Sequence, residues 1–384
     1  MPETSSFPPP AGWPPRACTR KPSAGAFSRD PNAHYAVGCV MYLHALATAV
    51  PSATFSQSDC LQLAQQPNVH ALINRRSSLI LSSILRSDHG IATRHFAVTD
   101  PEHVFEYSAD QLNETFRTEA PRLAGQALTS ALAQIGLRPD QLDALLICTC
   151  TGYLCPGVTS YVAEQLGLRP NAFLQDLVGL GCGAAIPTLR AASHVLAANP
   201  NAIVGCVAVE ICSAAFYLDD DPGVLISACL FSDGAAATIW RATPGPSGLR
   251  AFDFDTLHRP TDRDKLRFEQ RQGKLRNLLH RTVPELAAGA VSELWARRGS
   301  RPVRAVVAHP GGRDVLEALA PVVAPFELTA SIETLRDNGN MSSPSVLFAL
   351  ERTLARTDPA STGDFWLVSF GAGFSAHSCR LGPA

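Results

Sequence analysis

The sequence predicts an α/β fold in which helices cover mostly buried strands. Two observations lead to this prediction. Short apolar runs of strand length alternate with helical patterns from about residue 144 to the end of the chain. The chain is also long enough, at 384 residues of which 46% are hydrophobic, to bury a sizeable core. Because alternating strands and helices favour a layered sheet covered on both faces, we expect most strands to be buried.

The expected elements fall into a tail and two halves. Residues 1–34 are rich in Pro, Ser and Ala without a sustained period, and are predicted to form a disordered tail. Residues 35–245 and 246–384 are predicted to be two halves of similar element order, divided at Pro244-Gly245-Pro246. Each half has a strand–turn–helix unit with a reactive-looking residue at its turn, which indicates a duplicated fold.

The apolar runs give the expected elements in order. In the first half we expect a strand at 39–47, helices to about residue 85, strands at 144–150, 172–177, 203–210 and 235–240, and helices at 158–166 and 184–198. In the second half we expect strands at 249–257, 303–308, 365–370 and 374–381, a long helix at 275–297, and helices at 313–319 and 344–355.

Composition excludes several classes of protein. The formal net charge of −2 is not the basic excess that nucleic-acid binding requires. No apolar run reaches the roughly 18 residues of a membrane-spanning helix, and the first residues do not resemble a secretory signal. The 11 cysteines, an odd number without a repeating framework, indicate reduced thiols. We therefore expect a cytoplasmic protein without nucleic acid or stable membrane association.

Cys182 is the first candidate catalytic residue. It lies in the run Gly179-Leu180-Gly181-Cys182-Gly183, where a strand is expected to turn sharply into a helix. The glycines permit tight backbone angles and leave room for a substrate carbonyl, while the N-terminus of the helix favours the thiolate. The alternative is an ordinary buried cysteine of the core.

His309 and Asn340 are the other two candidates. His309 ends an apolar strand, a position at which α/β sheets place functional residues, and Pro310-Gly311-Gly312 follows it. Asn340 follows Asn338-Gly339, which could equally be an ordinary turn before a Ser-capped helix. Together the three residues form a coherent set. An imidazole can hold the cysteine as a thiolate–imidazolium pair, and an amide can donate to a developing oxyanion, or can orient the histidine as in a protease.

A metal site is an alternative use of the cysteines. Cys148, Cys150 and Cys155 lie close together in the sequence. However, Cys148 and Cys150 would share one face of a strand, and no CxxC pair or nearby histidine completes four ligands. We expect no metal.

At this point the motifs closely resemble those of the type III polyketide synthases, the chalcone synthase-like enzymes, over roughly residues 37 to 382. The matching segments are Gly181-Cys182-Gly183, Glu210 in its strand, Phe231-Ser232-Asp233-Gly234, His309-Pro310-Gly311-Gly312, Gly339-Asn340-Met341-Ser342-Ser343 and Phe370-Gly371-Ala372-Gly373. The resemblance implies a duplicated thiolase-type αβαβα five-layer fold and a homodimer.

The resemblance also implies a reaction. Cys182 would take an acyl group from an acyl-CoA starter, and malonyl-CoA would lose CO2 to give an enolate whose oxygen His309 and Asn340 hydrogen-bond. Attack on the Cys182 thioester would add two carbons, and after several rounds the chain would cyclise. No metal or redox cofactor would be needed. Phe231 would be the gatekeeping aromatic of the cavity, and Ser342, Gly371 and Gly373 would contact the substrate.

Five cavity positions depart from the plant pattern. Cys150, Cys212 and Ala215 stand where plant enzymes have threonines, Cys155 stands at the methionine that reaches across the dimer, and Asn277 stands at a second gatekeeping phenylalanine. A more apolar cavity is similar to that of bacterial members that make alkylpyrones or alkylresorcinols from fatty acyl starters. The alternative is a naphthalene- or phloroglucinol-type product made from malonyl-CoA alone, because bacterial naphthalene-forming members also have a cysteine at position 150.

Two further segments bear on substrate binding and ring closure. Ala372 replaces a proline of the family, and Pro344 departs from it just after the Asn340 motif, so the mode of cyclisation is open. Arg75, Arg76 and Arg86 could pair with CoA phosphates, or could be ordinary solvated helix charges.

Three rival functions would each require other features. A ketoacyl synthase that starts fatty-acid synthesis would normally have His-Gln-Ala-Asn in place of His309-Pro310-Gly311-Gly312. A cysteine hydrolase would release free acid without consuming malonyl-CoA. A noncatalytic binding protein would have no need of an intact Cys-His-Asn set. The sequence therefore predicts an acyltransferase that uses malonyl-CoA.

Overall fold

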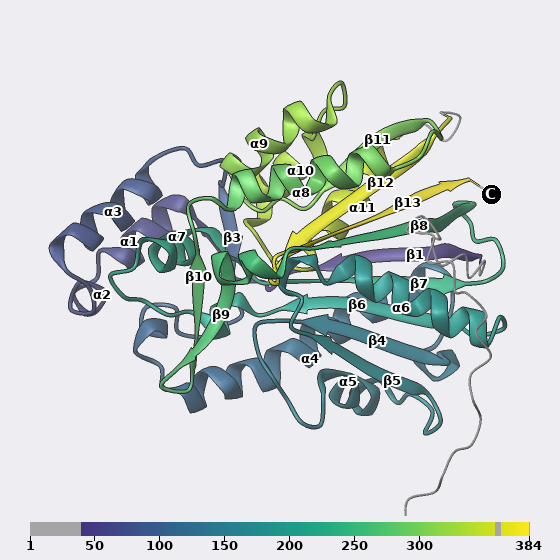
Figure 1. Ribbon diagram of the computed structural model, residues 1–384. Coiled ribbons are helices and arrows are strands. Elements are labelled where there is room, and N and C mark those ends of the chain that lie inside the picture. The colour runs from purple at the N-terminus through teal and green to yellow at the C-terminus, as the bar shows by residue number, and fades with distance from the viewer. Residues whose placement is uncertain (1–39, 358–361, 384) are drawn as a thin grey trace, which may run out of the picture. The chain divides into compact units, whose positions relative to one another are not determined.

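Nine strands run side by side in one mixed sheet (Figure 1). The computed structural model describes residues 40–357 and 362–383, so the predicted tail at 1–34 lies outside the described residues. From edge to edge the order is β11, β12, β13, β8, β1, β7, β6, β4, β5. In chain order these strands are β1 (Met41–Ala49), β4 (Ala144–Thr149), β5 (Phe173–Val178), β6 (Val204–Glu210), β7 (Gly234–Arg241), β8 (Leu249–His258), β11 (Val303–Ala308), β12 (Asp364–Gly371) and β13 (Ser375–Pro383).

The sheet is built twice from the same pattern of strand directions. In the first half, β1 pairs antiparallel with β7, β7 pairs antiparallel with β6, and β6 pairs parallel with β4. In the second half, β8, β13, β12 and β11 follow each other in the same sequence of directions. β1 and β8 join the two halves antiparallel to each other. We propose that residues 35–245 and 246–384 are the two copies.

The helices and the two halves of the sheet form five layers, in the order helix, strand, helix, strand, helix. α6 (Ala185–Ala198) and α11 (Ser345–Arg356) share one core with strand residues of both halves and form the central layer. α4 (Ala109–Gln134) and α5 (Val158–Leu166) cover the outer face of the first half, and α8 (Val283–Arg297) and α9 (Arg313–Val323) cover that of the second. The strands alternate accordingly: in β4, Leu146 faces the central layer and Leu145 faces α4.

The remaining helices and strands lie outside the nine-stranded sheet. They are α1 (Gln57–Ala64), α2 (Pro67–His70), α3 (Arg75–Arg86), α7 (Pro222–Leu230), α10 (Thr329–Asn338), the paired strands β2 (Thr54–Ser56) and β3 (Thr93–His95), and the hairpin β9 (Leu266–Arg271) and β10 (Lys274–Leu279). The hairpin is a two-stranded sheet of its own, beside α7 (Figure 1). Within the part of the chain that is described, no helix is both long and apolar enough to cross a membrane.

The expected helix at 275–297 was wrong in its first third. Residues 274–279 form β10, and the helix begins at Val283 with Pro284 in its first turn. The hairpin turns at Gln272 and Gly273, whose φ angles of +52° and +76° suit a tight two-residue hairpin turn. The apolar residues before Val283 were therefore assigned to a helix although they belong to a strand.

α4 is a helix of 26 residues that the sequence patterns did not reveal. Its buried residues are distributed widely around the helix, and Pro121 lies inside it. A helix buried on many sides has no clear 3.6-residue period, so its apolar pattern gives little signal.

Candidate functional site

Cys182 lies in a tight turn between β5 and α6. Gly181 has a φ of +56°, and Gly181–Gly183 form one turn of 3₁₀ helix directly before α6. The backbone of Gly371 packs against this turn, because a Cβ at Gly371 would lie 2.6 Å from Gly183 N and 2.9 Å from Cys182 N. Only glycine fits at position 371, so the end of β12 fixes the backbone that presents the thiol.

Two cysteines of this site share one hydroxyl. Ser342 Oγ donates to Cys182 Sγ over 3.2 Å and lies 3.3 Å from Cys150 Sγ. Ser342 itself has a φ of +59°, a left-handed conformation that is uncommon for a residue other than glycine. Such strain collects at functional sites, where the surrounding structure enforces it.

Asn340 is joined to this group and to the histidine loop. Its Oδ1 accepts from Ser342 N at 2.8 Å, and its Nδ2 donates to the carbonyl oxygen of Gly311 at 3.2 Å. Asn340 also forms a β-bridge with Phe231, in which Asn340 N donates to Leu230 O and Ser232 N donates to Asn340 O. The amide is thus held in a fixed orientation from both sides, with one side toward the loop after His309.

His309 follows β11 directly and is almost fully buried. Its backbone N–H donates to Val368 O at 2.8 Å, and its ring lies edge-on to Phe370, with ring centroids 5.2 Å apart. Phe370 precedes Gly371, which contacts the backbone of Cys182. Among the described residues, no hydrogen bond joins His309 or Asn340 directly to Cys182, and His309 Nδ1 is without a hydrogen-bond partner.

Burial determines the charge state of the group. It raises the pKa of the Cys182 thiol to about 12, although the Ser342 hydrogen bond acts in the opposite direction. Burial also lowers the pKa of His309 to about 3. Both residues are therefore neutral at pH 7. Burial thus opposes the expected thiolate–imidazolium pair in the ligand-free protein, since it favours the neutral form of both groups.

Glu210 supports the loop on one side of the thiols. The carboxylate is fully buried at the end of β6 and accepts from Cys150 N, from the backbone and hydroxyl of Thr151, and from the hydroxyls of Thr149 and Ser343. Burial raises its pKa. The sequence showed the motif match at Glu210. Its role as an acceptor for residues 149–151 and for Ser343 could not be predicted, because these segments are far from Glu210 in the sequence.

A cavity lies next to the Cys182 thiol. Of the predicted residues, it is lined by Cys150, Cys182, Cys212, Phe231, Asn277 and Ser342. Four further lining residues escaped the sequence analysis: Thr151, Leu266, Arg267 and Phe268. Gly181 and Ala372 complete the lining.

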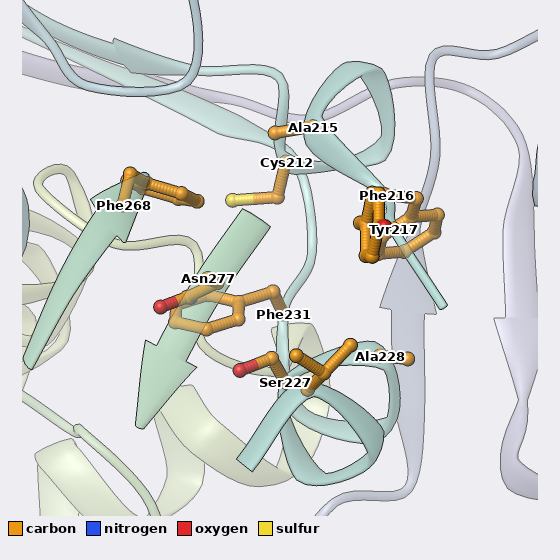
Figure 2. Close-up of a pocket in the computed structure, with 10 residues that line it drawn as sticks. Cys212, Ala215, Phe216, Tyr217, Ser227, Ala228, Phe231, Phe268 and Asn277 are labelled. Carbon is orange, nitrogen blue, oxygen red and sulfur yellow. The ribbon is translucent and has the colours of Figure 1, made fainter. Parts of the chain in front are cut away.

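A second cavity shares part of its lining with the first, and Figure 2 shows the residues around it. Cys212, Phe231, Phe268 and Asn277 line both cavities. The other residues of the second cavity are Ala215, Phe216, Tyr217, Val224, Ser227 and Ala228. In Figure 2, Phe268 and Asn277 approach from the hairpin side, opposite Phe216 and Tyr217. Phe268 was missed because its segment was not recognised as part of a hairpin; its pairing with the predicted residue Asn277 would have revealed it.

Some predicted residues lie away from the two cavities. Cys155 and Gly373 are exposed and line neither of them, and Arg76 and Arg86 are exposed on α3. Arg75 lines a separate surface groove of about 620 Å³, together with His70, Ile73, Ser78, Leu79 and Ser82. In residues 40–357 and 362–383, no cluster of His, Cys, Asp or Glu side chains has a metal-binding arrangement.

A known protein family matches the part of the chain that contains Cys182. The family described as FAE1/Type III polyketide synthase-like protein matches residues 52–249, a segment that includes Cys182, Glu210 and Phe231. The chain is 28% identical over 357 residues to a 1,3,6,8-tetrahydroxynaphthalene synthase of Streptomyces peucetius subsp. caesius, covering 88% of this chain and 92% of that protein. It is 29% identical over 330 residues to a 3,5-dihydroxyphenylacetyl-CoA synthase of Streptomyces toyocaensis, covering 80% and 81%.

Solved structures share the fold. PKS-I of the brown alga Ectocarpus siliculosus matches with a TM-score of 0.81 at 23% identity, over 90% of this chain and 98% of that one. The 1,3,6,8-tetrahydroxynaphthalene synthase of Streptomyces coelicolor A3(2) matches with a TM-score of 0.77 at 24% identity, over 89% and 99%. The expected duplicated thiolase-type αβαβα fold is thereby confirmed.

Proposed function

Since the chain belongs to the FAE1/type III polyketide synthase-like family and is an acyltransferase, we propose that Cys182 holds the growing polyketide as a thioester. The observation that supports this role most directly is the position of the thiol. Cys182 lines a cavity and is connected through Ser342 to Asn340, and through the Phe370–Gly371 segment to His309. Contacts thus link three residues that are remote in sequence, and of these three Cys182 lines the cavity.

Loading transfers an acyl group from CoA to the thiol. Cys182 Sγ forms a new bond to the thioester carbon, the bond from that carbon to the CoA sulfur breaks, and the thiol proton leaves with CoA. Because the Cys182 pKa is raised, the proton has to leave as the bond forms, and the Ser342 hydroxyl is placed to stabilise the developing thiolate.

Extension requires an enolate. Malonyl-CoA loses CO2, and the electron pair of the broken bond moves onto the thioester oxygen. A neutral imidazole and an oriented amide are suitable donors to this oxygen, because neither gives up a full proton before the charge develops. The lowered pKa of His309 keeps its ring neutral throughout the physiological range. The carbanion then attacks the Cys182 thioester and releases the thiolate.

For the substrate, we favour malonyl-CoA as both starter and extender, with a hydroxylated aromatic product. Two relatives support this choice by name, a tetrahydroxynaphthalene synthase and a dihydroxyphenylacetyl-CoA synthase. The thiol of Cys150 lies in the cavity as expected for a naphthalene-forming member. Phe268 and Phe231 stand where the two cavities meet, so a bulky starter would have to displace an aromatic ring.

A fatty acyl starter, giving an alkylpyrone or alkylresorcinol, is the second candidate. The specific observation in its favour is the second cavity. Its lining is mainly apolar, with Phe216, Val224 and Ala228 facing the space beyond Phe231. An alkyl chain would bury apolar surface there, which is favourable by about 25 cal/mol per Å².

A homodimer is proposed on the basis of the edge strand β5. This strand ends the nine-stranded sheet, yet Phe173 and Val178 are each about half exposed (51% and 52%). An open edge with exposed apolar residues favours pairing with another strand. Cys155 is exposed in the loop that follows β4. It is the residue expected to face the partner subunit.

CoA binding is proposed for the groove on α3. Arg75 and His70 border it, and the exposed apolar side chain of Leu79 lies on the same surface. A guanidinium is suited to bind phosphate, and an apolar surface to contact the pantetheine or adenine.

The test of this function uses the full chain and two conditions. Incubation with malonyl-CoA alone should yield an aromatic product, and added acyl-CoA starters should not increase malonyl consumption. If only fatty acyl-CoA starters support product formation, the second candidate replaces the first. If no starter leads to malonyl consumption above that of Cys182→Ala, the proposed polyketide synthesis is wrong.

A further inference from the structure

The hairpin β9–β10 has two chemically different faces. Phe268 and Asn277 are paired directly across it, and both line both cavities. Glu269 and Arg276, the next pair, are also directly opposite each other. Because neighbouring residues of a strand point to opposite faces, Glu269 and Arg276 lie on the face turned away from Phe268 and Asn277.

Arg276 is bound by three carboxylates from two parts of the chain. Its Nε lies 2.7 Å from Asp219 Oδ2, one Nη lies 3.0 Å from Glu269 Oε1, and the other lies 3.4 Å from Asp221 Oδ2. The arginine side chain is only 11% exposed, so these pairs are less screened than surface pairs. Glu269 in turn pairs with Arg267 at 2.8 Å, and Arg267 lines the cavity at Cys182.

Two of the three partners of Arg276, Asp219 and Asp221, belong to the opposite wall of the second cavity. Asp219 and Asp221 lie between Tyr217, which lines this cavity, and α7, whose Val224 also lines it. Asp221 is the N-cap of α7 and accepts from Gly223 N at 2.8 Å. Arg276 therefore joins the hairpin wall to the wall formed by the segment before α7 and by the helix itself.

A second contact fixes the same two walls at close range. A Cβ at Gly223 would lie 2.4 Å from the carbonyl oxygen of Leu279, the last residue of β10. Only a glycine allows the first turn of α7 to approach β10 this closely. The distance between the walls is thus set at two places, by backbone contact at Gly223 and by ion pairs at Arg276.

We propose that Arg276 is a positioning residue that sets the width of the second cavity, and thereby the length of polyketide or starter that the site accepts. This inference rests on the proposed function, because it names a control on that reaction. Arg276 lines neither cavity and does not contact the reacting atoms. It acts by holding Phe268 and Asn277 at a fixed distance from Phe216 and Val224.

The experiment compares three variants of the full chain. Arg276→Gln removes the charge, Arg276→Lys keeps it without the planar fork, and Arg271→Gln removes an exposed arginine of the same hairpin that lies 3.7 Å from Asp219. Products are separated by the number of malonyl units incorporated, and kcat and KM for malonyl-CoA are measured in parallel. Hydrogen exchange of the amides at 266–279 is measured on the ligand-free protein.

Arg276→Gln should change the ratio of the main product to products with other extension numbers by about fivefold, because it removes the ion pairs with Asp219, Asp221 and Glu269. Arg276→Lys should restore part of the ratio, and Arg271→Gln should leave it unchanged. Exchange at 266–279 should accelerate in Arg276→Gln while that of α4 stays constant.

An equal decrease of all products, with their ratio unchanged, would show that Arg276 is only structural and would overturn the proposal. If Arg276→Gln does not fold, Asp219→Asn, which removes a pair that joins the two walls, should shift the ratio in the same direction, and an unchanged ratio there is equally contradictory. If the wild-type chain consumes no malonyl-CoA, the proposed function fails, and unaltered hairpin exchange in the variants still decides against the role of Arg276.

Discussion

The hydroxyl of Ser342 donates a hydrogen bond to the sulfur of Cys182 over 3.2 Å. This serine lines the same cavity as Cys182, and its backbone N–H donates to the amide oxygen of Asn340. Ser342 is therefore the shortest described connection between the thiol and the amide. A hydrogen bond to a thiolate stabilises the charged form, so this serine opposes the effect of burial.

Alkylation of Cys182 should report both effects. With a pKa of about 12, the thiolate fraction rises about tenfold per pH unit from pH 7 to 10 without a plateau, and the rate with iodoacetamide should follow it. Ser342→Ala removes the donor, raises the thiol pKa further and should slow the reaction about tenfold at each pH. Mass spectrometry of the Cys182 peptide separates this site from the other cysteines.

Cys150→Ala is the matched control for this measurement. It removes the other sulfur beside Ser342 Oγ and leaves the donor to Cys182 in place, so the alkylation rate should not fall. A plateau in the wild-type rate below pH 9 would contradict the raised pKa.

Gly371→Ala should disrupt the nucleophile turn. The added Cβ would lie 2.6 Å from Gly183 N and Leu180 O, which are backbone atoms that cannot yield without moving Cys182. We expect a loss of about 1–3 kcal/mol in the free energy of unfolding and slower acyl loading. Urea unfolding and loading assays measure the two effects.

Gly125→Ala, in α4, provides the comparison. Its new Cβ meets only the flexible side chain of Gln165, at 3.2 Å or more, and alanine suits a helix better than glycine by about 1 kcal/mol. Activity and stability should be retained. Equal losses in both variants would mean that the crowding at Gly371 has no special effect.

Phe268→Ala should enlarge the site. The ring lines both cavities, so its removal joins them into a larger space. Products with more extensions, or starters with longer chains, should increase relative to those of the wild type, as measured by mass spectrometry. Phe252→Ala, which removes a ring packed against Arg250 and Arg301, should leave the distribution unchanged. An unaltered distribution in Phe268→Ala would exclude a size-limiting role for this ring.

Phe173→Lys should separate the proposed dimer. A lysine on the open edge of β5 opposes pairing with a second strand. Sedimentation equilibrium should give the mass of two chains for the wild type and a shift toward one chain for the variant. Leu79→Lys changes a side chain that is more exposed (64%) but lies on α3, and should keep the wild-type mass. A wild type of single-chain mass would refute the dimer.

The positions of the three proposed catalytic residues could be predicted better than their surroundings. Cys182 follows β5, His309 follows β11 and Asn340 precedes α11, so local pattern placed each of them near the end of an expected element. Strands such as β4 were recognised because their residues are buried on both faces and form continuous apolar runs.

The rest of the site could not be predicted, because it depends on contacts between segments that are distant in the sequence. The hairpin that bears Phe268 was hidden by apolar residues that continue into α8, and only the positive φ angles at Gln272 and Gly273 distinguish a turn there. The charge states of Cys182 and His309 could not be read from neighbouring residues, because burial by separate elements determines both. The sharing of one hydroxyl by Cys150 and Cys182 likewise depends on the fold.

The β-bridge between Phe231 and Asn340 has a consequence for enzyme engineering. A substitution at Phe231 chosen to admit a larger substrate would strain the same bridge that orients the amide, so selectivity and turnover would change together. Phe268 and Asn277 belong to a hairpin outside the main sheet and have no bridge to Asn340. Directed evolution toward new chain lengths should therefore begin on β9–β10, where the volume of the site can be altered independently of the chemistry.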